Sequence, residues 1–310
     1  MPELPEVETV RAGLAAHALG RRIVRVDVAG ERTTRRQAGG ALALVDALEG
    51  ASFTAAVRRG KFCWLTLDTG RALLVHLGMS GQLLVRGAGQ DAQDDPRHLR
   101  ARIRFADDGE LLFIDQRTFG YLTSSDLVPT ADGGPGGFGS DDPRLPLEVA
   151  GIARDLLDPA LRIDELVTAV RTRRSAVKRA LLDQSLVSGV GNIYADEALW
   201  RARVHPERAT RGLPRLAVRS VLESAAGVMQ DALAQGGTSF DALYVDVNGA
   251  SGYFDRSLSV YGQTGRPCPR CGTAIVRSEF MNRSSHWCPT CQPAPRGAAR
   301  PVDRGAAARR

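Results

Sequence analysis

The first residues of the chain bring a nucleophile and acids together. Residues 1–6 read Met-Pro-Glu-Leu-Pro-Glu. After removal of Met1, which a small second residue permits, the chain would begin with the secondary amine of Pro2 beside the carboxylate of Glu3. An α-amino group titrates near ~8 and a lysine near ~10.4, so the terminal amine is the better nucleophile at neutral pH. The pattern predicts covalent catalysis, while a frayed end whose prolines only start a helix explains the same residues equally well.

A helix must follow this segment to position it. Val7, Val10 and Leu14 recur at helical spacing, and Pro5 suits the first helical position, where a missing N–H costs nothing. The positive end of such a helix would favour the neutral form of the terminal amine. We therefore expect the amine and its neighbouring acid to lie at a helix N-terminus.

Four of the five cysteines form a metal-binding pattern. Cys268 and Cys271 are two residues apart, sixteen residues follow, and Cys288 and Cys291 repeat the spacing. Two such pairs facing each other across a hairpin are typical of a structural zinc site. We expect one zinc per chain, because the span is too short for a core of its own and needs the metal to fold. Disulfides are the alternative, disfavoured in a reducing compartment. Cys63 is expected to be a small buried residue.

Lysine is rare in this chain. Of the 41 basic residues only Lys61 and Lys178 are lysines, and the rest are arginines. An ammonium can titrate and transfer a proton, whereas a guanidinium effectively cannot. The two lysines are therefore candidates for a catalytic role, although chance alone could also leave two lysines in an arginine-rich chain.

The opening Met-Pro-Glu-Leu-Pro-Glu-Val-Glu resembles the N-terminus of bacterial formamidopyrimidine-DNA glycosylases, and later motifs extend the resemblance over about residues 1–291. The resemblance implies a base-excision-repair enzyme that removes oxidised purines, 8-oxoguanine and formamidopyrimidines, and cleaves the strand by β,δ-elimination as an AP lyase. Its terminal proline forms a Schiff base with the sugar of the damaged nucleotide. On this resemblance Pro2 is the nucleophile, Glu3 the acid, and Glu6 a residue that shapes the same site.

The same resemblance marks residues on loops. Lys61, in a basic turn before a strand, matches a catalytic lysine that contacts the phosphate beside the lesion and assists proton transfer. Arg283, between the cysteine pairs, matches a catalytic arginine that binds the phosphates around the lesion. Met79, Arg117 and Phe119 match residues that fill the gap left by the flipped nucleotide. As bare sequence the first is only a basic turn, and the Met and Phe would ordinarily be core. The other DNA contacts that the resemblance implies are His98, Arg173, Lys178 and Asn192.

Some positions depart from the commonest family residues. Gln116 and Thr118 stand where proline and a second arginine are usual, and Arg100 replaces a frequent histidine. These departures concern contact details rather than the reaction. The loop around Ala250 and Ser251 matches the mobile lid of the family.

Residue patterns predict an α+β, multidomain fold. Alternating apolar residues between turns predict an N-terminal β-sandwich with flanking helices over residues 1–125. Residues 126–150, rich in Gly, Pro and Asp, predict a linker or flexible loop, or an unimportant insertion. Helical periodicity over 151–262, with the run Gly-Val-Gly-Asn ending at Asn192, matches a helix-two-turns-helix DNA-binding domain. A β-hairpin zinc finger over 263–291 and a disordered basic tail over 292–310 complete the expected order.

Charge and hydropathy indicate which class of partner the protein binds. The net charge of +6 and the basic C-terminal region favour a polyanion, and the resemblance makes it damaged double-stranded DNA. No apolar run approaches the ~20 residues of a membrane span, so we expect a cytoplasmic, nucleoid-associated monomer.

Two other functions fit parts of the pattern. An endonuclease VIII-like glycosylase for oxidised pyrimidines shares the terminus and the zinc motif, but Leu4 and the Met79 loop argue against it. A non-catalytic zinc-ribbon DNA-binding protein would leave Glu3 and Lys61 without a role.

Overall fold

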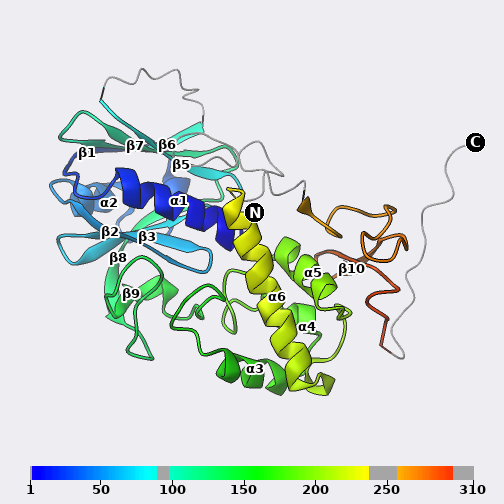
Figure 1. Cartoon of the computed structure of the whole chain (residues 1–310). Coiled ribbons are helices and arrows are strands. Elements are labelled where there is room, and N and C mark those ends of the chain that lie inside the picture. Colours follow the sequence, from blue (N-terminus) through cyan, green and yellow to red (C-terminus); the bar gives the residue numbers. More distant parts are fainter. Residues whose placement is uncertain (1, 89–97, 237–256, 296–310) are drawn as a thin grey trace, which may run out of the picture. The chain divides into compact units, whose positions relative to one another are not determined.

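Figure 1 shows the computed structural model of the chain, which describes residues 2–88, 98–236 and 257–295. The chain divides into two compact units, Met1–Leu161 with Met229–Arg256, and Arg162–Val228 with Ser257–Arg310. Each is described by itself. The predicted lid around Ala250 and Ser251 and the tail residues 296–310 lie outside the described residues. In the part of the chain that is described, no helix is both long and apolar enough to cross a membrane.

The first unit contains two antiparallel sheets. One sheet has the order β1 (Ile23–Val28), β6 (Leu99–Phe105), β7 (Glu110–Asp115) and β5 (Gly81–Arg86). The other has the order β2 (Phe53–Arg59), β3 (Phe62–Leu67), β4 (Arg71–His76), β8 (Tyr121–Pro129) and β9 (Arg144–Pro146). Alternate residues point inward because strand side chains have a period of two, so Leu73 of one sheet and Leu83, Ile103 and Phe113 of the other share one buried core.

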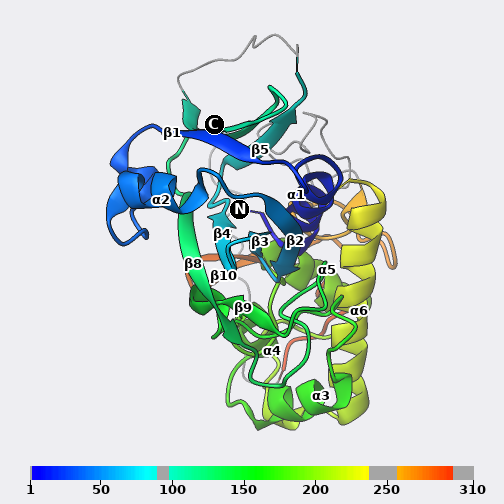
Figure 2. The same ribbon diagram turned by 90° about the vertical axis from the view of Figure 1, so that its left-hand side faces the viewer.

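Two helices flank this sandwich. α1 (Leu4–His17) contacts β2 and β3 of one sheet and β5 of the other, and α2 (Gly40–Leu48) contacts β1 and β8. A short 3₁₀ helix, η1 (Glu31–Thr34), precedes α2. Figure 2 shows α1 and α2 on opposite sides of the sheets. The helix predicted after the N-terminal segment and the flanked β-sandwich are both confirmed.

Residues 126–150 differ from the predicted linker. β9 pairs with β8, and Phe138 exchanges two backbone hydrogen bonds with Arg58 of β2, at 2.8 and 2.9 Å. Gly136 and Gly137 pack so tightly that an added Cβ would lie 2.0 and 2.4 Å from the carbonyl oxygens of Arg144 and Arg58. The segment is thus built into the first unit through backbone contacts, which leave no side-chain period in the sequence.

The second unit combines helices with a two-stranded hairpin that lies between the two cysteine pairs in the sequence. Its helices are α3 (Ile163–Thr172), α4 (Val177–Leu182), α5 (Asn192–Arg201), the short η4 (Thr210–Gly212) and most of α6 (Arg215–Ala234). The turns between α4 and α5 include Gly189 at φ 86°, and α5 begins directly after Gly191. β10 (Val276–Phe280) and β11 (Arg283–Trp287) form the hairpin. One cysteine pair precedes β10 in the sequence and the other follows β11.

Candidate functional site

The N-terminal segment is packed rather than frayed. Pro2 is buried, and Glu3 and Glu6 are only 4% and 7% exposed. The backbone N–H of Glu3 donates to Glu6 Oε2 at 2.9 Å, so the side chain of the first helical turn fixes the residue that precedes the helix. Together with the Glu3 side chain, which accepts from the backbone N–H of Glu6, this bond forms a capping box at the start of the helix. The predicted nucleophile and acid therefore have a defined place at the start of α1.

Lys61 lies at the tight turn between β2 and β3. Gly60, directly before it, adopts a positive φ of 58° that an L side chain rarely allows. The N–H of Gly60 donates to Asp155 Oδ2 at 3.0 Å, and Arg58 Nη1 donates to the same oxygen at 2.7 Å. Asp155 thus holds the turn that presents Lys61. No sequence pattern had marked Asp155.

Arg58 connects this turn to the helix that carries the N-terminus. Its Nε donates to Glu8 Oε2 at 2.8 Å, and Glu8 lies on α1. The Arg58 and Asp155 side chains are each 1% exposed. Burial alone would lower the pKa of Arg58, but the carboxylates of Asp155 and Glu8 outweigh it and raise the pKa above its usual value. The guanidinium is therefore a permanently charged link between α1 and the Lys61 turn.

Two loops carry the residues predicted to fill the DNA stack. Phe119 is 48% exposed, so it is not the core residue that its type suggests, whereas Met79 is half-buried. The fully buried Asp115 joins the loops. It accepts hydrogen bonds from the Ser80 hydroxyl at 2.5 Å, the N–H of Arg117 at 3.2 Å and the N–H of Gly120 at 2.7 Å. The loops are thus held as one rigid surface feature.

The residues that differ from the commonest family residues lie in or beside the two loops joined by Asp115. Arg100 Nε donates to the carbonyl oxygen of Asp115 at 2.9 Å, so it supports the same loops. Thr118 adopts a positive φ of 55°, and Gln116 is exposed beside Arg117. His98 is half-buried directly before β6.

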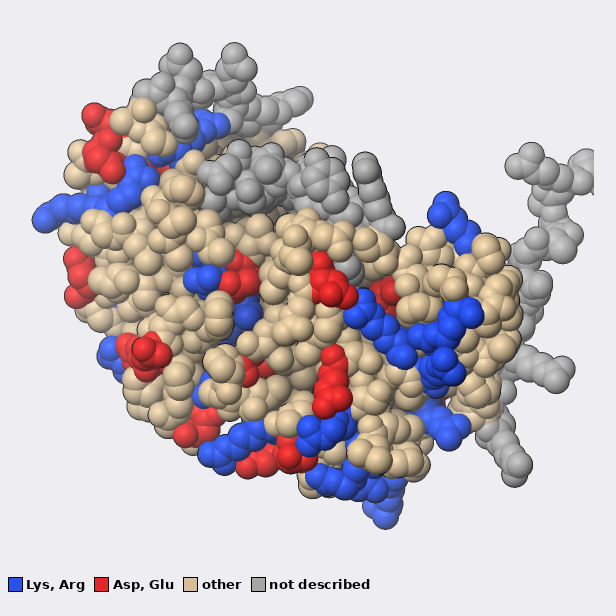
Figure 3. Space-filling view, in the orientation of Figure 1, with Lys and Arg blue, Asp and Glu red and all other residues tan. Residues whose placement is uncertain are grey.

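The second unit has an arginine-lined pocket of about 560 Å³. Arg173, Arg174 and Arg179 line one part of it, and Arg283 and Met281 of the zinc hairpin line another. Arg173 is 47% exposed and forms a long ion pair of 3.5 Å with Asp183. Figure 3 shows Lys and Arg side chains gathered over the part of the surface that this unit occupies. Such a pocket offers several guanidinium groups to phosphates.

Lys178 does not lie where a direct DNA contact is expected. Its side chain is 0% exposed, its Nζ forms an ion pair of 2.6 Å with Asp196, and it donates to the carbonyl oxygen of Ser284 at 3.1 Å. Asn192 Nδ2 donates to the same carbonyl oxygen at 2.9 Å. In this structure the ammonium is enclosed by protein and is not at the surface to meet a phosphate.

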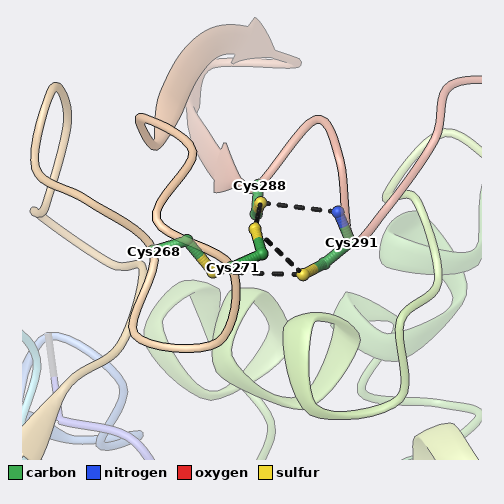
Figure 4. A group of neighbouring side chains, drawn as sticks. All are labelled: Cys268, Cys271, Cys288 and Cys291. Carbon is green, nitrogen blue, oxygen red and sulfur yellow. Dashed lines mark hydrogen bonds between the residues drawn. The ribbon is translucent and has the colours of Figure 1, made fainter.

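The four predicted metal ligands come together. Their sulfur atoms all lie within 4.8 Å of one another, with three of the separations at 3.4, 3.5 and 4.0 Å. Figure 4 shows the side chains converging from two turns. Tetrahedral zinc with Zn–S bonds of about 2.3 Å needs sulfur atoms about 3.8 Å apart, whereas a disulfide needs about 2.05 Å. The donor set therefore fits a zinc ion, and none of the five cysteines is in a disulfide.

The sequence was compared with protein-family models and with known proteins. Three family models match it: the formamidopyrimidine-DNA glycosylase N-terminal domain over residues 1–122, the H2TH domain of the same enzyme over 152–242, and a zinc finger found in FPG and IleRS over 265–294. A formamidopyrimidine-DNA glycosylase of Nocardioides sp. is 58% identical over 299 residues, covering 96% of each chain. The chain belongs to the formamidopyrimidine-DNA glycosylase family.

Further relatives of this family member have similar coverage. The formamidopyrimidine-DNA glycosylase of Salinispora arenicola is 55% identical over 96% of this chain and 98% of its own. Among solved structures, Lactococcus lactis Fpg in complex with DNA containing an abasic site has a TM-score of 0.76 and 28% identity. A structure of MutM with DNA containing carbocyclic 8-oxo-G has a TM-score of 0.77. Both matches cover 94% of this chain and all of the other.

Proposed function

We propose that this protein removes oxidised purines from duplex DNA through a Schiff base formed by the amine of Pro2. As a member of its family the chain is a base-excision-repair DNA glycosylase with AP lyase activity. The observation that carries the mechanistic proposal is the buried, capped N-terminal segment, in which Glu6 holds the backbone of Glu3 beside Pro2.

The proposed reaction begins with base flipping, because the glycosidic bond cannot be reached within the stacked duplex. With Met1 removed, the neutral amine of Pro2 attacks the sugar C1′, the bond from C1′ to the base breaks, and the base leaves with a proton. Glu3 donates a proton to the sugar-ring oxygen, which opens the ring and gives an iminium ion. The iminium acidifies the neighbouring C–H bonds, and successive β- and δ-eliminations release the phosphates on both sides.

Phosphate binding divides between the two units in this proposal. Lys61, on its Asp155-held turn, contacts a phosphate beside the lesion, and Arg283 contacts the neighbouring phosphates from the zinc hairpin. Arg173 extends this set, since it lines the same pocket as Arg283. Asn192 contributes from the start of α5, because the positive end of a helix favours an anion.

The gap left by the flipped nucleotide is filled, in this proposal, by Met79, Arg117 and Phe119. Their loops are joined by Asp115, so the three side chains enter the duplex as a preformed wedge. His98 adds a contact to the backbone of the DNA.

We assign one structural zinc to the four cysteines. When bound, the ion supplies folding energy and takes no part in the chemistry. The Trp200 Nε1–H donates to Cys268 Sγ at 3.4 Å, and the N–H of Cys291 donates to Cys288 Sγ at 3.4 Å. Such donors suit thiolates that are bound to a metal.

The partner that we propose is damaged double-stranded DNA, and the solved relatives contain DNA with an abasic site or with carbocyclic 8-oxo-G. The net charge of +6 supports this assignment. We propose that the protein acts as a monomer in the cytoplasm, in association with the nucleoid. We also propose domains at 1–125, 151–262, 263–291 and 292–310, and we assign the segment 126–150, predicted as a linker, to the first unit because β9 pairs with β8.

Borohydride trapping tests the nucleophile. Incubation with a duplex containing one 8-oxoguanine and borohydride should give a covalent protein–DNA product that peptide mapping places on Pro2. Protein that keeps an N-terminal tag should give neither crosslink nor cleavage, and removal of the tag to leave Pro2 first should restore both. A crosslink on Lys61, or normal cleavage by the tagged protein, would overturn the mechanism. The same assay on a second duplex, which carries an oxidised pyrimidine, tests the endonuclease VIII-like alternative, because that enzyme would cleave the second duplex in preference to the first.

A further inference from the structure

The carbonyl oxygen of Ser284 receives two side-chain donors from the helical part of its unit. Lys178 Nζ of α4 lies 3.1 Å from it, and Asn192 Nδ2 at the start of α5 lies 2.9 Å from it. Ser284 directly follows Arg283, so both donors act on the backbone next to the arginine that is proposed to bind the lesion phosphates. Two residues expected to bind DNA thus converge on one carbonyl group of the protein.

Asp196 of α5 continues the same attachment along β11. Besides its ion pair with Lys178, its carboxylate accepts from the Ser285 hydroxyl at 3.1 Å and from the His286 N–H at 2.9 Å. Lys178 and Asp196 therefore hold three successive residues, 284–286. Both side chains are 0% exposed. The ammonium also lies 5.2 Å from the ring centroid of Phe280, on the other strand of the hairpin.

The hairpin needs this attachment to present Arg283 in one place. Its two strands have five residues each, and an isolated two-stranded hairpin is marginally stable at best. The zinc ligands lie beyond the far ends of the strands, whereas Arg283 begins β11 beside the exposed tip residue Met281. The proposed zinc would therefore fix one end of the hairpin, and the Lys178–Asp196 pair fixes the end that carries the arginine.

We propose that Lys178 is a positioning residue for Arg283 and makes no phosphate contact of its own. An ammonium that is enclosed and paired at 2.6 Å with a buried carboxylate would have to leave that carboxylate uncompensated in order to reach DNA, which is strongly unfavourable. The inference rests on the proposed role of Arg283. It predicts that replacing Lys178 removes the phosphate contact of Arg283 and removes no further phosphate contact.

The salt dependence of DNA binding reports how many phosphates the protein neutralises and so separates the two roles. The slope of the logarithm of the binding constant against the logarithm of salt concentration changes by about 0.9 for each phosphate that is no longer neutralised. We would measure it with a duplex carrying a stable abasic analogue, for the wild type, Lys178→Met, Arg283→Ala and the double variant. A positioning role gives one common decrease of about 0.9 in all three variants. Decreases of about 0.9 in each single variant and about 1.8 in the double variant would overturn the proposal.

A charge-balanced variant guards against misfolding. Lys178→Met leaves the buried Asp196 carboxylate without the ammonium paired with it, whereas Lys178→Met with Asp196→Asn removes both charges together. The second form should retain one zinc per chain and show the same single decrease in slope. If Arg283→Ala leaves the slope unchanged, the proposed role of Arg283 fails. A decrease in Lys178→Met would then show that Lys178 binds phosphate directly.

Amine labelling tests the location of Lys178 independently of Arg283. The chain has two lysines, so a water-soluble acylating reagent followed by peptide mapping gives a two-residue comparison. Lys61, which is partly exposed, should react in the free protein, whereas Lys178 should stay unmodified until the protein unfolds. Equal labelling of the two lysines in the free protein, with protection of Lys178 by DNA, would refute the positioning role.

Discussion

Replacement of Asp155 by Asn should destabilise the first unit strongly. Asp155 accepts from Arg58 at 2.7 Å and from the Gly60 N–H at 3.0 Å, and both Arg58 and Asp155 are 1% exposed. Asn keeps an oxygen that can accept from Gly60 but removes the negative charge. The buried guanidinium then has one carboxylate, that of Glu8, in place of two.

The expected size follows from burial. Removing one partner of a buried ion pair costs about 3–5 kcal/mol, and the remaining contact with Glu8 places this variant near the lower end, at about 3 kcal/mol. That is a large part of a typical total stability of about 5–15 kcal/mol. The Gly60 turn should also loosen, because the amide oxygen that remains accepts more weakly than a carboxylate. The rate of strand cleavage should then fall because Lys61 is less well placed.

Asp107→Asn provides a matched control. Asp107 pairs with Arg21 at the same distance of 2.7 Å, but its side chain is 59% exposed, so its replacement should cost less than about 1 kcal/mol. Urea unfolding of both variants and the wild type gives the comparison. Similar destabilisation of the two variants would refute the argument that burial, rather than the distance between the paired atoms, sets the cost.

Three other predictions concern the metal, the wedge and pH. Cys288→Ser should lose zinc and DNA binding together, and metal-free protein with full affinity, by metal analysis and titration, would contradict this. Met79→Ala and Phe119→Ala should slow excision of 8-oxoguanine more than cleavage at an abasic site, because unstacking costs less there; equal effects in a nicking assay would count against the wedge. Burial, with the nearby arginines, lowers the pKa of His76 to about 4. Well above pH 6.5 the ring is neutral in both states, and as the pH falls through about 6.5 the unfolded ring takes up a proton first, so stability is lost. Between pH 7 and 5 the loss is about 2 kcal/mol, and urea unfolding of His76→Gln should show a smaller loss.

The features that the sequence predicted well are those in which side-chain type repeats at a fixed spacing. The cysteine pairs predicted a four-sulfur cluster, because metal geometry demands that ligand set at that spacing. Alternating apolar residues predicted the sandwich, because one face of each strand is buried. Pro5 and the apolar positions after it predicted a helix that begins at Pro5, and the observed helix begins one residue earlier, at Leu4.

Features that depend on single long-range contacts left no such signal. Asp155 is an isolated acid in the sequence, and only the fold brings it to Gly60, 95 positions away. The segment 126–150 is held by backbone contacts at glycines, so its composition resembled that of a linker. For Lys178, resemblance indicated an important residue but could not indicate which way the ammonium points.

Because Cys63 and the other four cysteines lie in different units, the number of reactive thiols reports which part of the protein has opened. Cys63 lies in the core of the first unit, and burial raises the pKa of its thiol to about 12. A thiol-reactive dye should therefore leave the metal-bound protein unmodified, consume four equivalents when a chelator opens the hairpin, and reach the fifth only when the sandwich unfolds. One colour reaction can thus distinguish metal loss from unfolding of the first unit, and it requires no engineered label.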